Sequence, residues 1–291
     1  MNKMNNIFVN NIQKVCFHDG PGIRTTVFLN ACLLKCPWCA NPETSFFSKK
    51  YYVSNNCQLE NNGCAYGLNC QGKLSCESTL EKNYSRCPVE AINKNIYEYS
   101  IDELEQILLK DKFLYENNGG ITFSGGEPLL QSKNLSLLLK RLKDRNINIT
   151  IETCLYTNKE NLEQIIDFVD LFIVDIKILQ SSENKKIISG NLENYFDNVD
   201  LIFKKKKNVI FRIPLIKPYI TNEGNLTKIY SFLEKYKPIK VEIFKGHNLG
   251  KEKYLKLDLS YEKVETINDE EIKKIKEKIE QLQIDVEIMS F

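Results

Sequence analysis

The sequence has 291 residues, 42% of them hydrophobic, which is enough to bury one large core or two ordinary ones. Its 40 Lys and Arg nearly balance 38 Asp and Glu, and a net charge of +2 is unlike the concentrated basic excess of nucleic-acid-binding proteins. No apolar run approaches membrane-spanning length, and the polar start lacks the apolar segment of a signal peptide. We therefore expect a cytoplasmic protein that binds neither nucleic acid nor a membrane.

Six short, β-branched apolar runs are predicted to be strands, and they alternate with amphipathic segments of helical length. The strands are expected at 25–30, 120–123, 147–153, 171–177, 208–215 and 240–246. The helices are expected at 100–117, 133–145, 159–169, 193–205, 223–235 and 269–283. The first helix should begin with a capping box of Ser100 and Glu103 and stop at Gly119-Gly120. The alternation predicts an α/β fold with a parallel sheet. Six units are too few to close an eightfold barrel, so we expect a partial (β/α)6 TIM-like barrel.

Residues 49–97 interrupt this alternation. The segment is rich in Asn, Gly and Cys and shows no convincing amphipathic helix. It is predicted to be a small inserted domain that is held together by its cysteines instead of an apolar core. The chain would then consist of a core part over 1–48, the insert over 49–97, and the rest of the core over 98–291.

Ten cysteines in a reducing compartment should be metal ligands, catalytic groups or buried apolar residues rather than disulfides. Cys32, Cys36 and Cys39 form a Cys-x-x-x-Cys-x-x-Cys pattern directly after the first predicted strand. Three thiolates can bind three irons of a 4Fe–4S cluster and leave the fourth iron free for an amine and a carboxylate of a small molecule. A zinc site, which usually takes four ligands, and a chance group of buried thiols are the alternatives.

Each predicted strand ends in chemically active residues. In a parallel α/β barrel the carboxyl ends of the strands meet at one face, where binding and catalytic groups collect. We therefore expect these residues to surround one site. In strand order they are the three cysteines, the Ser124–Pro128 loop, Glu152 with Thr153, Asp175 with Lys177, Arg212, and His247.

The cysteine pattern, with Trp38 before its last Cys, resembles the signature of radical S-adenosylmethionine enzymes. Four longer blocks, at 11–44, 99–131, 211–220 and 246–262, resemble the activating enzymes of glycyl radical enzymes. The resemblance covers nearly the whole chain. It implies reductive cleavage of S-adenosylmethionine at a 4Fe–4S cluster, and a 5′-deoxyadenosyl radical that removes hydrogen from a backbone glycine of a partner enzyme under anaerobic conditions.

The resemblance also implies roles for individual residues. The three cysteines hold the cluster, and Lys177 joins them as a catalytic residue. Gly125 and Gly126, which lack a Cβ, would let the backbone approach the amino group of S-adenosylmethionine. The full set implied to contact S-adenosylmethionine is Trp38, Ala40, Gly125, Gly126, Glu127, Glu152, Thr153, Asp175, Ile176, Lys177, Arg212 and His247.

The segment "DGPGIR" is similar to the part of the family that lies near the incoming glycine. Its members are Asp19, Gly20, Gly22 and Arg24. A tight turn that needs Gly and Pro explains the same residues equally well. The partners implied are a glycyl radical enzyme, whose identity the sequence does not name, and a reduced flavodoxin or ferredoxin as electron donor.

The chain departs from the family in three places. Leu155 stands where Gly is common, which could reshape the loop after the third strand, and Lys245-Gly246 replaces an aromatic pair. Relatives with a ferredoxin-like insert carry eight cysteines and two extra clusters. This insert has five, Cys57, Cys64, Cys70, Cys76 and Cys87. One additional 4Fe–4S cluster is favoured over zinc or metal-free thiols, and the four ligands are left open.

Two other functions share part of these features. A radical enzyme that acts on a small molecule or a ribosomal peptide would share the three-cysteine site without needing the matched blocks at both ends of the chain. An iron–sulfur electron carrier would need the cluster and none of the other residues at the strand ends.

Overall fold

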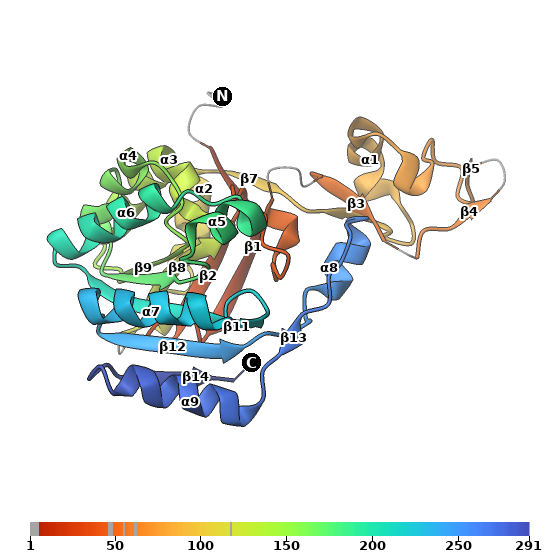
Figure 1. Cartoon of the computed structure of the whole chain (residues 1–291). Coiled ribbons are helices and arrows are strands. Elements are labelled where there is room, and N and C mark those ends of the chain that lie inside the picture. The colour runs from red at the N-terminus through yellow and green to blue at the C-terminus, as the bar shows by residue number, and fades with distance from the viewer. Residues whose placement is uncertain (1–5, 46–48, 55, 61–62, 117, 291) are drawn as a thin grey trace.

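The computed structural model describes residues 6–45, 49–54, 56–60, 63–116 and 118–290, and a single large sheet forms its centre (Figure 1). The strand order is β14-β12-β11-β10-β9-β8-β2-β1-β7, with short β13 paired to β11. The sheet is mixed but mostly parallel, because every pair from β2 to β14 along this order is parallel and only β1, β7 and β13 run antiparallel to their neighbours. The strands are β1 (Asn6–Cys16), β2 (Arg24–Leu29), β7 (Tyr97–Ser100), β8 (Gly120–Gly125), β9 (Ile149–Thr153), β10 (Leu171–Asp175), β11 (Asn208–Lys217), β12 (Lys240–Lys245), β13 (Glu265–Thr266) and β14 (Val286–Met289).

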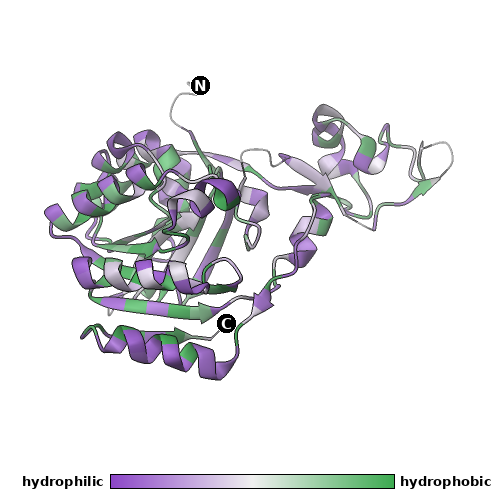
Figure 2. Ribbon diagram, viewed as in Figure 1, coloured by the Kyte–Doolittle hydropathy of each residue, from purple (hydrophilic) through white to green (hydrophobic). Residues whose placement is uncertain are grey.

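Amphipathic helices cover the outside of this sheet. Their inward faces and the strands form one apolar core, and Figure 2 shows hydrophilic residues on the outward faces. The curved, unclosed sheet confirms the partial barrel. The helices are α2 (Ile101–Leu109), α3 (Ser132–Asp144), α4 (Lys159–Glu163), α6 (Leu192–Lys204), α7 (Glu223–Tyr236) and α9 (Asp269–Glu280), with short α5 (Ser181–Glu183) and a π-helix over Asn184–Ile188.

All six predicted strands are present, and the structure adds β1, β7, β13 and β14 to the sheet. The sequence does not reveal β1 because polar residues interrupt its apolar ones and only Ile7 and Val9 are buried. The helix expected at 100–117 has the predicted capping box, but α2 ends at Leu109 and a 3-10 turn follows at Lys112–Leu114. Position 117 lies outside the described residues. The helix expected at 159–169 is divided into α4 and a 3-10 turn at Ile166–Phe168.

The cysteine-rich segment projects from one side of the barrel (Figure 1). Strand β3 (Tyr51–Val53) pairs with β6 (Ile92–Lys94), and β4 (Leu59–Glu60) pairs with β5 (Gly63–Cys64). The expectation of no helix and no core is wrong here. Helix α1 (Glu77–Asn83) is present, and its Leu80 joins a small buried cluster that is separate from the main core. The boundary expected at residue 48 lies outside the described residues.

Two sets of contacts hold this insert against the barrel. The Asn95 side chain donates to the backbone oxygen of Glu43 at 3.1 Å, and the Asn10 side chain of β1 donates to the Asn95 backbone oxygen at 2.8 Å. On the other side, Lys73 pairs with Asp258 at 3.0 Å, just beyond helix α8 (Lys251–Lys256). Helix α8 therefore lies between the insert and the barrel (Figure 1). Within the described residues, no helix has the length and apolar character that crossing a membrane requires.

Candidate active site

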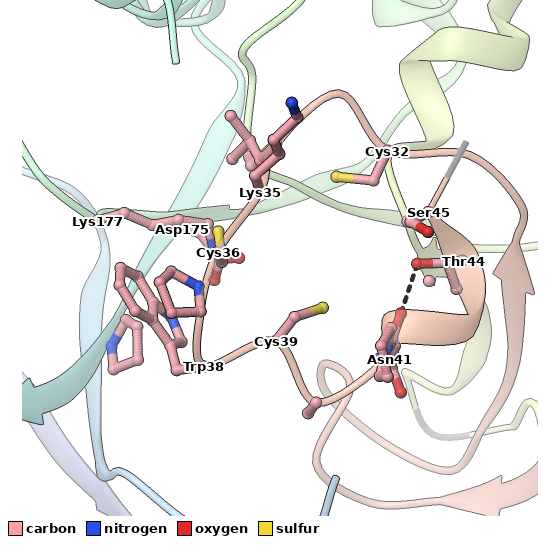
Figure 3. Close-up of a pocket in the computed structure, with 18 of the residues that line it drawn as sticks. Cys32, Lys35, Cys36, Trp38, Cys39, Asn41, Thr44, Ser45, Asp175 and Lys177 are labelled. Atoms are coloured by element: carbon pink, nitrogen blue, oxygen red, sulfur yellow. Dashed lines mark hydrogen bonds and ion pairs between the residues drawn. The ribbon is translucent and has the colours of Figure 1, made fainter. Parts of the chain in front are cut away.

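The loop with the three clustered cysteines leaves the carboxyl end of β2 and is anchored on both sides. Ala31, which begins it with a positive φ of 84°, donates its N–H to the Thr44 oxygen at 2.8 Å. The Lys35 N–H donates to the Ile188 oxygen of the π-helix at 3.0 Å. Figure 3 shows Cys32, Cys36 and Cys39 spaced along this loop around a common hollow, with Asp175 and Lys177 beside Cys36.

This hollow belongs to a cavity of about 930 Å³ at the carboxyl ends of the strands. Its wall brings together most of the residues expected at the site, from six different strand ends and the 17–23 loop. The expected residues that line it are Asp19, Cys32, Cys36, Trp38, Cys39, Ala40, Gly125, Gly126, Glu152, Thr153, Asp175, Lys177, Arg212 and His247.

Two glycines let the β8 end pack directly against the start of the cysteine loop. Gly125 has a φ of +108°, which favours glycine. A Cβ on Gly126 would lie 2.1 Å from the Ala31 carbonyl oxygen, a clash with backbone that a side-chain movement cannot relieve. The Gly126 N–H donates to the Leu29 oxygen at 2.9 Å. These residues therefore place one wall of the cavity as well as lining it.

Arg212, on β11, lies between two carboxylates, one on the neighbouring strand β12 and one on β9, beyond β10. Its Nη1 donates to Glu152 at 2.5 Å, its Nη2 and Nε donate to Glu242 at 2.7 and 3.0 Å, and Nη2 also donates to the His18 oxygen at 2.8 Å. Burial disfavours the guanidinium charge, but the two carboxylates outweigh it and raise the pKa of Arg212. Burial also raises the pKa of Glu152. A guanidinium has about five N–H donors, so one on Nη1 remains for a ligand.

Lys177 provides a second cation at the cavity. Its ammonium contacts Asp175 at 2.7 Å, and both side chains are largely buried. Burial acts against its charge, but Asp175 and the thiols of Cys36 and Cys154 outweigh burial and raise the pKa of Lys177. Lys177 therefore keeps its positive charge next to the cysteine loop. Burial lowers the pKa of His247, which favours its neutral form.

The thiol set fits an iron–sulfur cluster chemically. Burial raises the pKa of Cys36, and raises that of Cys39 to about 11. Thiolates at these positions therefore need a cationic metal centre to stabilise them. The part of the chain that the structure describes has no group of three or more His, Cys, Asp or Glu arranged around one metal ion. Three thiolates that bind three different irons are farther apart than the ligands of a single ion.

Three expected site residues do not line the cavity. They are Glu127 and Ile176, expected to contact S-adenosylmethionine, and Arg24, expected near the incoming glycine. The Glu127 carboxylate is buried and accepts from the Thr153 hydroxyl, the Leu129 N–H, and both the N–H and thiol of Cys154. Ile176 is fully buried. The Arg24 side chain is also fully buried and donates to the Thr122 hydroxyl at 2.7 Å and the Ile121 oxygen at 2.9 Å.

Gly20 and Gly22 shape the 17–23 loop without lining the cavity. Gly22 has a φ of +72°, and a Cβ there would meet the Gly119 nitrogen at 2.4 Å. Of the four residues expected to meet the incoming glycine, Asp19 lines the cavity. Its carboxylate accepts from the Thr26 hydroxyl at 2.6 Å.

Cys154 and Tyr254 are among the wall residues that the sequence reasoning missed. Cys154 follows the third strand end, and its neighbouring thiol lowers the pKa of Cys32. Its position directly after Glu152 and Thr153 was the available signal. Tyr254, on α8, also lines the cavity, but no motif marked it. Leu155 has a φ of 60°, so this leucine adopts the left-handed backbone that glycine favours.

The five thiols of the insert fall into two groups. Cys70 is buried in the small core of the insert, Cys57, Cys64 and Cys87 pack against that core, and burial raises the pKa of Cys57. Cys76 is exposed, and hydrogen bonds from Ser78 and Thr79 lower its pKa to about 7.

Comparison with known proteins agrees with this site. Residues 26–224 match the family model described as the Radical SAM superfamily. The chain belongs to the radical SAM superfamily. Within it, the chain is a member of the activating enzymes of glycyl radical enzymes, because it is similar to curated members over most of its length.

Two of these relatives are from Clostridioides difficile. A 4-hydroxyphenylacetate decarboxylase activating enzyme of strain 630 is 32% identical over 86% of this chain and 85% of its own. A trans-4-hydroxy-L-proline dehydratase activating enzyme is 31% identical over 93% of this chain and 95% of its own. The radical SAM fold is also seen in a solved domain of a pyruvate-formate lyase-activating enzyme from Bacteroides vulgatus ATCC 8482. The structural match covers 60% of this chain and 100% of that domain, with a TM-score of 0.50 and a sequence identity of 23%.

As a radical SAM enzyme, the chain is an oxidoreductase whose family cofactors are a 4Fe–4S cluster and S-adenosylmethionine. The described cavity provides suitable groups for both. Three thiols border it on one side, and the charged pairs of Lys177 and Arg212 border it on the other.

Proposed function

We propose that this cavity holds a 4Fe–4S cluster and S-adenosylmethionine, and that the enzyme generates a glycyl radical in a partner protein. The observation that supports it best is the convergence of three thiols, two glycines, four charged residues and a histidine on one cavity from six strand ends. When bound, the reduced cluster supplies one electron that cleaves S-adenosylmethionine to methionine and a 5′-deoxyadenosyl radical, which takes a hydrogen atom from the glycine.

The chain's residues would bind and orient the two ligands. Cys32, Cys36 and Cys39 would hold the cluster, and the backbone at Gly125 and Gly126 would bind the amino group of S-adenosylmethionine. Lys177 keeps a positive charge for the carboxylate or ribose, and the spare N–H of Arg212 suits the same groups. Trp38, Ala40, Glu152, Thr153, Asp175 and His247 line the remaining wall.

We propose that the partner's glycine reaches the cavity beside the 17–23 loop. Asp19 lines the cavity there, and its backbone oxygen accepts from the Thr122 hydroxyl at 2.6 Å. Arg212 holds the same loop through the His18 oxygen. One residue therefore connects the ligand wall with the loop that would meet the glycine.

The electron donor in this proposal is a reduced flavodoxin or ferredoxin, in the cytoplasm of an anaerobic cell. Such a carrier suits a reaction that needs single electrons at low potential. The proposal also includes a second 4Fe–4S cluster in the insert, because four of its five thiols lie together. This centre would relay electrons or help to dock the partner.

The test is anaerobic reconstitution with iron and sulfide, followed by reduction with dithionite or reduced flavodoxin. We expect 5′-deoxyadenosine in both cases. Mixing with purified 4-hydroxyphenylacetate decarboxylase or trans-4-hydroxy-L-proline dehydratase, the partners that the relatives' names suggest, should give a glycyl doublet in electron paramagnetic resonance spectra with one of them. Cys36→Ala should abolish 5′-deoxyadenosine, while the control Cys16→Ala, outside the cavity wall, should not.

Two results would contradict the proposal. Continued 5′-deoxyadenosine formation by Cys36→Ala would remove the three-thiol site from the mechanism. Formation of 5′-deoxyadenosine with modification of a small molecule or peptide, and no glycyl radical in any candidate partner, would favour the rival class of radical enzyme.

A further inference from the structure

The insert has five cysteines, and the structure separates four of them from the fifth. We propose that Cys57, Cys64, Cys70 and Cys87 bind one 4Fe–4S cluster and that Cys76 is not a ligand. The assignment rests on the proposed function for the existence of a second cluster and adds its ligands and its number. It follows from three structural links between the four cysteines and from the different surroundings of the fifth.

The first link is the β4–β5 hairpin, which places Cys64 near Cys57. Cys64 is paired with Leu59 across the hairpin. The Ala65 N–H donates to the Gln58 oxygen at 3.2 Å, and these two residues directly follow Cys64 and Cys57. Two thiols seven positions apart in sequence are thereby brought to one end of the insert.

The second link connects Cys57 with the Cys70 segment through Gly72. Gly72 has a φ of +54°, and a Cβ there would lie 3.3 Å from the Cys57 sulfur and 2.8 Å from Leu59. The chain after Cys70 therefore passes close to the Cys57 thiol, with a positive φ at Gly72 that favours glycine.

The third link is Asn83, which is buried and connects the segments of Cys70 and Cys87. Its side chain donates to the Asn69 oxygen at 3.1 Å, next to Cys70. Its backbone oxygen accepts from the Cys87 N–H at 3.0 Å. The Ala91 N–H then donates to the Cys87 sulfur at 3.4 Å, the kind of contact that stabilises a metal-bound thiolate.

The four sulfurs belong to the small core of the insert. Cys70 is buried in it, and Cys57, Cys64 and Cys87 pack against it. Its buried residues are few, and a domain of this size usually needs a metal or disulfides to be stable. A cluster bound at the four thiols would supply that stabilisation at the point where three chain segments meet.

Cys76 has different surroundings. It lies just before α1, is exposed, and places its sulfur 3.3 Å from the Ser78 hydroxyl and 3.2 Å from that of Thr79. It is not among the residues that pack against the insert core. Its thiol is therefore satisfied by its own helix and faces solvent.

A 4Fe–4S cluster suits this set better than zinc does. A zinc ion draws four ligands to about 2.3 Å from a single point, whereas a cluster distributes its thiolates over separate irons. The described sulfurs are gathered in one region without surrounding a single point. Four thiolates also match one cluster, and the two clusters of eight-cysteine inserts would need twice that number.

The test is an iron and sulfide count on the reconstituted full-length protein and its variants. We expect about eight irons in the wild type and about four when any two of the four assigned cysteines are changed to serine, because three thiolates can still hold a cluster. Cys76→Ser, the matched control, should keep about eight. A triple Cys32→Ala, Cys36→Ala, Cys39→Ala variant should retain about four irons and their spectroscopic signal, which isolates the insert centre.

Three results would overturn the assignment. They are a triple variant without iron, zinc in place of iron in that variant, or a Cys76→Ser variant that loses half of its iron. If the serine variants do not fold, as judged by circular dichroism, the triple variant with and without Cys76→Ser decides the question. A wild-type protein that forms no 5′-deoxyadenosine would instead count against the proposed function. The two results are separate, because the iron bound by the insert can be counted without measuring activity.

Discussion

Replacing Arg212 with methionine should destabilise the protein strongly, because buried Glu152 would lose its cation and buried Glu242 would keep only Lys240, at 2.8 Å. The side chains of Arg212 and Glu242 are 6% and 5% exposed, and that of Glu152 is 19% exposed. Breaking a buried ion pair of this kind costs about 3–5 kcal/mol. At about 2–4 °C per kcal/mol, the melting temperature should fall by roughly 6–20 °C.

The pH dependence of this loss has a definite sign. Burial already raises the pKa of Glu152, and Arg212 opposes that rise. Without the arginine, the folded-state pKa of Glu152 should increase further above its unfolded value. Folding then takes up a proton, so the deficit should be largest at about pH 8 and smaller at about pH 5.5.

The assay is thermal unfolding of the reconstituted protein under anaerobic conditions, monitored by circular dichroism at both pH values. Arg212→Lys keeps the charge and loses the forked contact, so it should be destabilised less. Arg212→Met combined with Glu152→Gln and Glu242→Gln should recover part of the loss. A single methionine variant within about 1 kcal/mol of wild type at neutral pH would refute the reasoning, because surface ion pairs behave that way.

Gly126→Ala should lower both the melting temperature and the iron content, since overpacking against the Ala31 backbone costs about 1–3 kcal/mol. An unchanged iron content would contradict the close packing of Gly126 against the cysteine loop. Cys76 should be alkylated by iodoacetamide at a rate that rises up to about pH 7 and then levels off, because its pKa is lowered to about 7. Peptide mass spectrometry measures this rate at each pH. A rate that still rises at pH values well above 8, as for an ordinary thiol, would contradict the lowered pKa. Ser100→Ala should cost about 1 kcal/mol in thermal unfolding by removing the α2 cap, while Ser136→Ala, on the exposed face of α3, should be near neutral; equal effects would argue against capping.

The features that the sequence predicted well depend on local patterns. The six strands between residues 24 and 245 are short apolar runs, and each is buried in the parallel part of the sheet. The capping box at Ser100 is a local interaction over three residues, and the structure contains both of its hydrogen bonds. The carboxyl ends of parallel strands lie at one edge of the sheet. The positions of the strands along the chain are therefore enough to predict that the residues after them meet in one cavity.

The features that the sequence reasoning missed depend on contacts between distant segments. Strand β1 is mostly exposed, and it is a strand because it pairs with β2 and β7. The Glu127 side chain was expected to contact a ligand, but it accepts hydrogen bonds from Thr153 and Cys154, about 26 residues away in sequence. Tyr254 reaches the cavity wall from α8, which no spacing rule indicates.

The sequence by itself determined the family, the three-thiol loop and the order of strands, because these follow from spacing and periodicity along the chain. Only the tertiary structure decided which charged groups remain free for a ligand and which of the five insert thiols lie together. Those outcomes depend on burial and on hydrogen bonds between residues far apart in sequence, such as Arg212 with His18 and Asn83 with Asn69. Spacing along the chain carries little information about such contacts, since folding brings the segments together through packing of the whole core.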